Sequence, residues 1–256
     1  MSIIDIIPHP LKDFYMKVSA QTIATFDNLL QTLNTIGIEK VIIEPGKIRA
    51  IDERKTVGTI TDQNVPDFDG NVVAVSRVKT LKDRLNLAKA QGDVAINATK
   101  SDKEATITML EVSAGKSKTQ FRCAAPEALK VPKTFNDKAA YELVISSKQI
   151  PLIAQADATM ASDGITIASK NGSTVSIELA DTSKDLFVFE LDNPATAING
   201  TTAGSFVHKY TSKALLSLLK EAAKTSATDD VKITIGAQGI LFVDVNGYKF
   251  FTLPQA

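Results

Sequence analysis

The sequence predicts an α+β fold in which one domain pattern, strand–helix–strands–helix–strands, occurs twice. Three observations lead to this prediction. Most of the chain consists of short runs rich in Val, Ile and Thr between turn dipeptides, four segments repeat apolar residues about every 3.6 positions, and both halves place these elements in the same order. Because the apolar face of each helix needs a partner, we expect the helices to pack on sheets.

Turn dipeptides and alternating hydrophobicity indicate the strands. Residues 173–180 and 231–236 alternate apolar and polar side chains, which is typical of half-buried strands. Asn-Gly between such runs is a strong hairpin signal. Turns are expected at Pro45-Gly46, Asp163-Gly164, Asn171-Gly172 and Asn246-Gly247.

Four segments with helical periodicity interrupt the strands. They are residues 21–36, 78–90, 147–159 and 211–225. Ser147 is a good N-cap for the third helix, and Pro151 lies close enough to its start to be tolerated. In the fourth helix Leu215, Leu218 and Leu219 share one face.

The two halves also align residue by residue. Residues 14–19 match 141–146, and residues 93–96 match 230–233, so the offset changes only from 127 to 137 positions. Duplication explains such a pattern better than coincidence does. We therefore expect an N-terminal domain at 1–125, a Pro- and Lys-containing connector at 126–138 and a C-terminal domain at 139–256.

Composition restricts the class of protein. The 256 residues are 44% apolar and 23% charged, which is a globular composition. No apolar run approaches the ~18 residues of a membrane span, and residues 1–10 make a poor signal peptide. A single cysteine, Cys123, fits a reducing compartment, so we expect a cytoplasmic protein without a membrane partner.

The net charge is zero, but the charges are segregated. The four predicted helices contain eight basic and four acidic residues and therefore carry +4, so the rest of the chain carries −4. In the last helix Lys213, Ser217, Lys220 and Lys224 recur every three or four residues, forming a stripe opposite the leucines. This stripe rises ~16 Å, a length over which duplex DNA presents roughly ten phosphates.

The candidate cations for binding duplex DNA are therefore lysines of the predicted helices: Lys79, Lys82, Lys89, Lys148, Lys213, Lys220 and Lys224. The first helix contributes only neutral groups at the corresponding places, Thr25, Asn28 and Thr32. A simpler interpretation is that any amphipathic surface helix carries lysine on its wet face. Two lysine-bearing helices at matching places of a repeat, with an acidic remainder, favour the DNA interpretation.

The organisation of the chain resembles the DNA sliding clamps, the polymerase processivity factors. The nearest types are the two-domain clamps of bacteriophages and the proliferating-cell-nuclear-antigen class. The similarity covers nearly the whole chain and is strongest at the C-terminus. It includes residues 210–216, the pair of runs 239–243 and 247–251, and Leu253-Pro254.

This resemblance implies a homotrimeric ring that encircles double-stranded DNA without sequence preference. The helices would line the hole and the sheets would form the outer wall, with residues 118–123 of one chain pairing with residues 185–191 of the next. The implied partners are a replicative DNA polymerase and a clamp loader in the host cytoplasm if a phage encodes the chain. Their peptides would enter an apolar pocket at Leu129, Val131, Leu253 and Pro254.

The sequence departs from the family in three places. Residues 1–12 precede the first strand of the usual fold, residues 192–204 form a longer loop rich in Ala, Thr and Gly, and the first helix has no basic residue. The last departure weakens the assignment of that helix to DNA.

Catalytic chemistry has little support. Cys123 and His208 could form a thiol nucleophile and its base, but a cysteine within a strand is usually a small buried hydrophobe. With only His9 and His208, a His-rich metal site is excluded. In Gly115-Lys116-Ser117, Leu110 replaces the first glycine of a phosphate-binding loop, so a hairpin turn is expected. We expect no enzymatic activity, metal or cofactor.

Two alternatives remain open at this point. A duplicated β-rich viral structural or assembly protein would explain the strands and the connector, but it gives the lysine stripe no role. An enzyme on a β-rich scaffold would need a triad, metal cluster or phosphate loop, and none is evident in the sequence.

Overall fold

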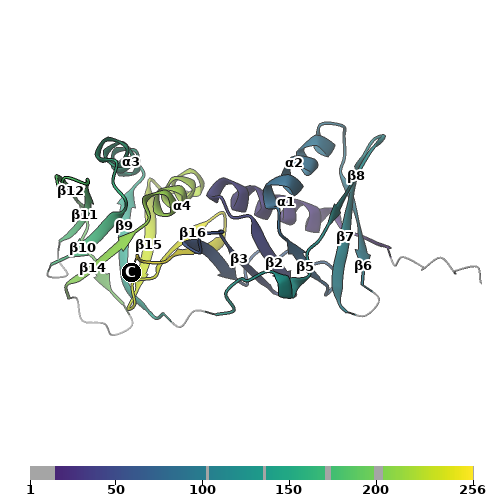
Figure 1. Cartoon of the computed structure of the whole chain (residues 1–256), viewed down its shortest axis with the longest axis horizontal. Helices are drawn as coiled ribbons and strands as arrows, with labels where there is room; N and C mark the ends of the chain where they lie inside the picture. The colour runs from purple at the N-terminus through teal and green to yellow at the C-terminus, as the bar shows by residue number, and fades with distance from the viewer. Residues whose placement is uncertain (1–14, 102–103, 135–136, 171–173, 199–203, 256) are drawn as a thin grey trace, which may run out of the picture.

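The computed structural model describes residues 15–101, 104–134, 137–170, 174–198 and 204–255. The molecule is elongated, with the helices along one side and the sheets along the other (Figure 1). The helices are α1 (Ala20–Ile36), α2 (Val78–Lys89), α3 (Gln149–Met160) and α4 (Ser212–Thr225). Each agrees with its sequence-based prediction to within two residues at either end.

The strands of the first half run as β1 (Tyr15–Lys17), β2 (Lys40–Glu44), β3 (Lys47–Ile51), β4 (Val57–Thr61), β5 (Val72–Val75), β6 (Ala95–Lys100), β7 (Thr106–Ala114) and β8 (Ser117–Arg122). The short 3-10 helix η1 (Pro126–Ala128) opens the connector. The second half contains β9 (Ala139–Ser146), β10 (Ile165–Ser169), β11 (Val175–Ala180), β12 (Leu186–Glu190), β13 (Thr196–Ala197), β14 (Phe206–Tyr210), β15 (Asp230–Gly236), β16 (Leu241–Val245) and β17 (Tyr248–Thr252).

The strand pairings repeat between the halves. In the first half β6 pairs with β1 and β7, and β3 lies between β2 and β4; in the second half β15 pairs with β9 and β16, and β11 lies between β10 and β12. The predicted duplicated fold is thus confirmed. β13 is an addition within residues 192–204, where Thr196 pairs with Glu142, so the described part of that stretch is not all loop.

The two halves share one sheet because β4 pairs antiparallel with β17. One rung, meaning a row of residues that are cross-strand partners from one strand to the next, crosses this junction. It consists of Val41, Ala50, Thr59, Phe250 and Val243. All five side chains are fully or nearly fully buried. Since side chains alternate between the faces of a sheet, this register puts the apolar faces of both halves, and therefore the helices, on one side.

Local sequence explains where the helices begin and end. The Ser19 side chain accepts the Thr22 N–H at 3.1 Å as an N-cap, and Gly37 ends α1 with φ of +89°, a conformation that favours glycine. The prediction that Ser147 caps α3 is wrong. That helix begins at Gln149, and its N-cap residue, Lys148, makes no side-chain capping bond. The Gln149 side chain instead accepts the Ser146 N–H at 3.0 Å.

Among the predicted turns, Pro45-Gly46 and Asn246-Gly247 each join two paired strands, as expected. Gly115-Lys116 likewise forms the β7–β8 hairpin turn, with Ala114 opposite Ser117. Asp163-Gly164 connects α3 to β10 and is not a hairpin turn. Asn171-Gly172 and the extension at residues 1–12 lie outside the described residues.

Gly58 is the residue at the β4–β17 junction that is least tolerant of a larger side chain. An added Cβ would lie 2.6 Å from Cζ of Phe251 and closer still to the carbonyl oxygen of Ala50. We expect Gly58→Ala to lower the free energy of unfolding by about 1–3 kcal/mol through overpacking. Urea denaturation checks this, with Ser117→Ala on an exposed edge as the control. A change below about 0.5 kcal/mol, the ordinary scatter of surface substitutions, would contradict it.

Candidate nucleic-acid interface

The lysine stripe of α4 points away from the core, as its periodicity predicts. Lys213, Lys220 and Lys224 are exposed, whereas Leu215 and Leu218 on the other face are buried. Lys224 forms an ion pair with Glu221 at 3.0 Å. Within the described residues, Lys213 and Lys220 have no ion pair.

A groove of about 340 Å³ runs beside this stripe, between α4 and the end of α1. Its lining includes all three lysines, Ser217 of α4 and Thr35 of α1. A groove with several mobile ammonium groups and neutral hydroxyls can hold phosphate oxygens without fixing their position.

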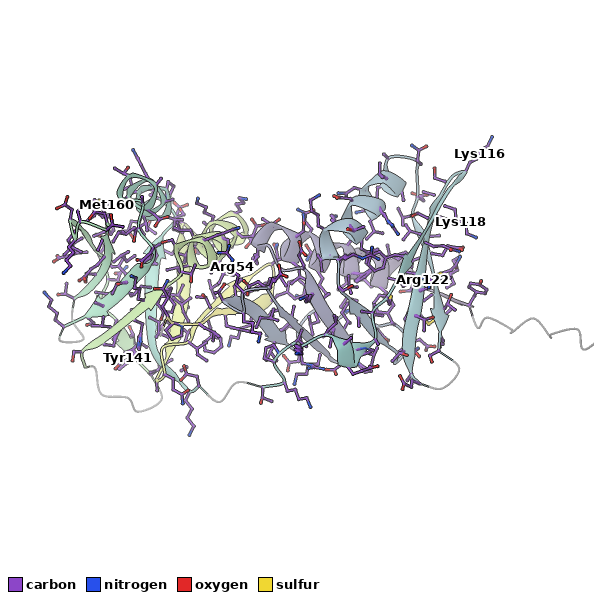
Figure 2. All side chains as sticks on the ribbon, viewed as in Figure 1. Arg54, Lys116, Lys118, Arg122, Tyr141 and Met160 are labelled. Atoms are coloured by element: carbon purple, nitrogen blue, oxygen red, sulfur yellow. The ribbon has the colours of Figure 1, made fainter. Side chains whose placement is uncertain are left out.

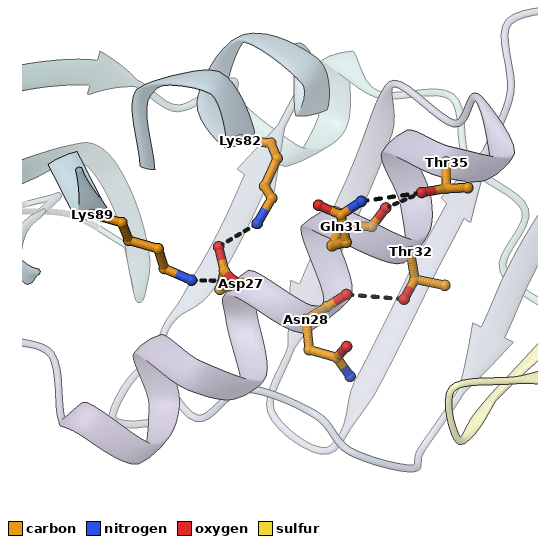
Figure 3. Close-up of polar contacts among 7 residues, drawn as sticks. All are labelled: Asp27, Asn28, Gln31, Thr32, Thr35, Lys82 and Lys89. Carbon is orange, nitrogen blue, oxygen red and sulfur yellow. Dashed lines mark hydrogen bonds and ion pairs between the residues drawn. The ribbon is translucent and has the colours of Figure 1, made fainter. Parts of the chain in front are cut away.

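The lysines of α2 are in a different situation, and one prediction is wrong. Lys82 is only 4% exposed and therefore cannot face DNA. Its ammonium lies 2.7 Å from Asp27 of α1, and the half-exposed Lys89 lies 2.6 Å from the other oxygen of the same carboxylate (Figure 3). Lys79 is exposed but pairs with Asp83 one turn later, at 2.7 Å. Every candidate lysine of α2 thus already has a carboxylate partner.

Asp27 is held ionised by this arrangement. Burial alone would raise the pKa of its carboxyl group, but hydrogen bonds and charge from Lys82 and Lys89 outweigh burial and lower the pKa below its usual value of 3.8. Sequence reasoning missed this role because Lys82 lies 55 positions away along the chain. Only the packing of α1 against α2 brings the three groups together.

The exposed face of α1 is neutral. Asn28, Gln31 and Thr35 lie on its surface, and the Gln31 amide donates to the Thr35 hydroxyl at 3.2 Å (Figure 3). Thr32 was expected on this face but is fully buried. Its hydroxyl donates to the Asn28 carbonyl and accepts from Asn246 of the β16–β17 turn. In α3, the one candidate cation, Lys148, is exposed at the boundary of the helix.

The four residues predicted for a partner pocket fall into two separate pairs. Leu129 is 9% exposed and packs, together with Val131, against Ile42 and Ala74 on β2 and β5. Leu253 and Pro254 instead run along β4 and β14: the Leu253 N–H donates to the Thr56 carbonyl at 3.0 Å, and Pro254 bridges to Tyr210. Among the described residues, neither the backbone hydrogen bonds nor the apolar cluster around Leu129 joins the two pairs.

The end of the connector is fixed by Asp137, a second residue that sequence reasoning missed. Its carboxylate accepts the backbone N–H groups of Gln238 at 2.9 Å and Ile240 at 3.0 Å. Gly236 makes room for it, because a Cβ there would collide with the Asp137 side chain. The connector is thus attached to the β15–β16 turn, close to the C-terminal half of the junction.

The catalytic alternatives gain no support from the geometry. Cys123 follows β8 and His208 lies on β14, in opposite halves of the molecule (Figure 1). Burial raises the pKa of Cys123 to about 12, which keeps the thiol protonated. Among the described residues there is no cluster of three or more potential metal-ligating side chains. None of the described helices is both long enough and apolar enough to cross a membrane.

Comparison with solved structures identifies the architecture. The proliferating cellular nuclear antigen of Entamoeba histolytica is similar over 95% of this chain and 99% of its own, with a TM-score of 0.61 and 13% sequence identity. The A. fulgidus PCNA, solved with a bound C-terminal region of FEN-1, is similar over 94% of this chain and 98% of its own, with a TM-score of 0.58 and 15% sequence identity.

The chain has the DNA sliding-clamp fold. No protein-family model matches the sequence, and no curated protein is detectably similar to it in sequence. The chain therefore shares the clamp fold with proteins to which its sequence is only 13–15% identical. What its residues do has to be argued from their own geometry.

The Asp27 pair gives a pH-dependent prediction. At pH 7 we expect Asp27→Asn to lower the free energy of unfolding by about 2 kcal/mol, because the buried Lys82 loses a charged acceptor. The depressed pKa means that this stabilisation is fully present above the ordinary carboxyl value of 3.8 and is lost as the pH falls through the folded-state value.

Urea denaturation between pH 7 and pH 3 should therefore show the gap between wild type and Asp27→Asn narrowing at the acid end. Asp83→Asn, which breaks an exposed pair, should cost less than about 1 kcal/mol. A gap that stays constant across the whole range would contradict the assignment.

Proposed function

We propose that this chain is a sliding clamp that closes into a ring around duplex DNA and tethers a replicative DNA polymerase. The observation that carries the proposal is that each end of the molecule has a strand equivalent to one of the two strands that pair at the internal junction, β4 and β17. Within the chain, β17 and β4 pair. Their equivalents, β8 and β12, lie at opposite ends of the molecule, and each has one edge that no described strand covers (Figure 1). Open strand edges are normally covered or paired.

The equivalence of β12 and β4 follows from the rungs of the sheets. In the first half a rung joins Val41, Ala50 and Thr59 on β2, β3 and β4. Counting from the left-handed residues that end α1 and α3, Gly37 and Ala161, Val41 corresponds to Ile165. The rung through Ile165 continues to Leu179 on β11 and Phe187 on β12. Phe187 on β12 is therefore the structural equivalent of Thr59 on β4.

The other end follows in the same way. Leu143, Ile233, Val243 and Phe250 form a rung across β9, β15, β16 and β17. Met16, which aligns with Leu143 in sequence, begins the matching rung, which runs through Ala98 and Leu110 to Phe121 on β8. Phe121 therefore stands where Phe250 stands.

Because Phe250 pairs with Thr59 inside the chain, Phe121 would pair with Phe187 of the next copy. In this antiparallel register Lys118, which pairs with Glu111 at 2.8 Å in the single chain, falls opposite Glu190, and both Lys118 and Glu190 are exposed. Figure 2 shows Lys118 on β8 together with Lys116 and Arg122, at one end of the molecule. Basic β8 and acidic-ended β12 are complementary in charge, which favours correct pairing over like-with-like pairing.

Exposed apolar side chains support the same junction. Leu186, Phe187 and Val188 of β12 are 37–59% exposed, and Leu87 of α2 and Leu152 of α3 are 71% and 52% exposed. The helices contact in the order α2, α1, α4, α3, so α2 and α3 are the outer ones. Closure would bring α2 of one copy to α3 of the next, as α1 meets α4 within the chain.

Three copies, with the first domain at residues 1–125, the connector at 126–138 and the second domain at 139–256, would complete the ring. The proposed number rests on the resemblance to the clamp family. The helix side would then form the hole. Lysine suits such a lining because it is a flexible point charge that attracts phosphate without locking it in position. Retention would come from enclosure, and the role on DNA requires no catalytic group.

Partner proteins would bind at the connector and the C-terminal tail, near Leu129, Val131, Leu253 and Pro254. The Asp137 attachment supports this, because it holds the connector beside the β15–β16 turn. The A. fulgidus neighbour was solved with a C-terminal region of FEN-1 bound, which is consistent with short peptide segments as ligands. We propose that a polymerase and a clamp loader use this surface here.

The register of the proposed junction can be tested by cross-linking. In a Cys123→Ser background, Gln120→Cys combined with Val188→Cys should form intermolecular disulfides on oxidation, since these positions fall opposite each other. Denaturing gels should show covalent trimers near three times 27.5 kDa. The control, Gln120→Cys with Glu190→Cys, places the thiols two residues out of register, beyond the ~4.5 Å Cβ separation that a disulfide allows. Equal yields from both pairs would refute the register.

Encirclement predicts retention that depends on DNA topology. We expect the wild-type protein, added to a linear duplex with one free end before that end is blocked, to remain on the DNA after a wash at salt high enough to screen phosphate contacts. Cutting the DNA between the blocks should release it. Pull-down before and after cleavage measures this. Release by salt alone, together with a monomeric mass in solution, would favour a structural protein of another kind.

A further inference from the structure

The cations on the helix side of the molecule are not equally available. Lys213 and Lys220 of α4 are exposed and have no ion pair within the described chain, and the side chain of Lys224, although paired, is 67% exposed. All three line one groove beside α1. Lys79 and Lys89 of α2 each lie within 2.7 Å of a carboxylate.

Two acidic residues thus pair with all three lysines of the first-half helices. Asp27 is shared by Lys82 and Lys89, and Asp83 is paired with Lys79. The exposed face of α1 contributes only uncharged residues, Gln21, Ala24, Asn28, Gln31 and Thr35. Arg84 is directed toward β8, where it donates to the Gln120 carbonyl and lies 5.7 Å from the Phe121 ring.

We infer that DNA is held mainly by the second half, through the lysine stripe of α4, because the lysines of the first-half helices are already paired with Asp27 and Asp83. The inference rests on the proposed clamp function and adds to it which part of the ring attracts the phosphates. In a trimer the attraction would come mainly from three α4 stripes, separated by helices whose lysines are paired.

The physical reason is competition for the ammonium groups. Binding to DNA gains free energy when a lysine neutralises a phosphate and releases condensed counterions. A lysine that is already paired with a carboxylate must give up that partner before it binds a phosphate. At longer range the negative charge of the carboxylate also offsets the attraction of the lysine for DNA. Lys213 and Lys220 form no ion pair within the described chain, so binding a phosphate does not require either of them to give up such a partner.

Two double variants with the same change in net charge test this inference. Lys213→Gln with Lys220→Gln removes two cations from α4, and Lys79→Gln with Lys89→Gln removes two from α2 while leaving Asp27 paired with Lys82. Affinity for a short fluorescent duplex is measured by anisotropy over a series of salt concentrations. Thermal unfolding of each variant confirms that it is folded.

The α4 variant should bind about tenfold more weakly or worse, and its plot of log K against log salt should flatten by about 0.9 for each phosphate that is no longer neutralised. The α2 variant should stay within about twofold of wild type, with an unchanged slope, because its lysines do not neutralise phosphates. Equal weakening in both variants, or a greater weakening in the α2 variant, would overturn the inference.

Removing the carboxylate partner of Lys89 provides a complementary test, in which binding to DNA should become stronger. Asp27→Asn should strengthen binding and steepen the salt dependence, since Lys89, with 47% of its side chain exposed, becomes free. Asp244→Asn makes the same charge change on the exposed face of β16 and should have little effect. Equal strengthening by both would mean that only net charge matters and would overturn the inference.

The proposed function fails by a different outcome. If the wild-type protein shows no topological retention on end-blocked DNA, the clamp proposal is wrong whatever the lysine variants do. If retention is present but the α2 and α4 variants lose affinity equally, only the division of labour between the halves is wrong.

Discussion

The architecture depends on the pairing of β4 with β17. This pairing makes two similar halves into one sheet, and its register decides which face of each half points the same way. A shift of one residue would put Thr59 and Phe250 on opposite faces of the sheet and would place the helices of the two halves on opposite sides. With the observed register, all four helices lie on one side of the sheet (Figure 1). A common helix side is a requirement for any channel that those helices could line.

The same junction explains why the described strands at the two ends of the molecule have exposed edges. The chain uses one β17-type edge and one β4-type edge internally, and among the described residues this leaves a β8 edge and a β12 edge without a partner strand. A head-to-tail contact between unlike edges either closes into a ring or extends into a filament. The twist and curvature set at the internal junction would be repeated at every contact, so closure follows if each contact copies the internal one.

The sequence was sufficient for the elements and their order because those depend on local patterns. Helical periodicity located α1 to α4, and glycine-containing turns located the β2–β3, β7–β8 and β16–β17 hairpins. It was insufficient for the state of the lysines. A helical wheel shows that Lys82 lies on a polar side of α2, but it does not show that α1 packs there and supplies Asp27. Burial of Thr32 by Asn246 has the same origin, since the two residues are 214 positions apart. The sequence also does not reveal the role of Asp137. Its carboxylate fixes the connector by accepting backbone N–H groups, and backbone groups leave no signal in a sequence.

Net neutrality and DNA binding are compatible in this molecule because charge is arranged at two levels. The sheets and loops balance the helices overall, and within the helices of the first half Asp27 and Asp83 are paired with all three lysines of α2. A clamp needs weak attraction, because contacts that are too strong would resist sliding while enclosure already prevents dissociation. If α4 alone supplies that attraction, each chain offers one cationic stripe next to a neutral helix. Phosphates could then move from stripe to stripe without all contacts breaking at once.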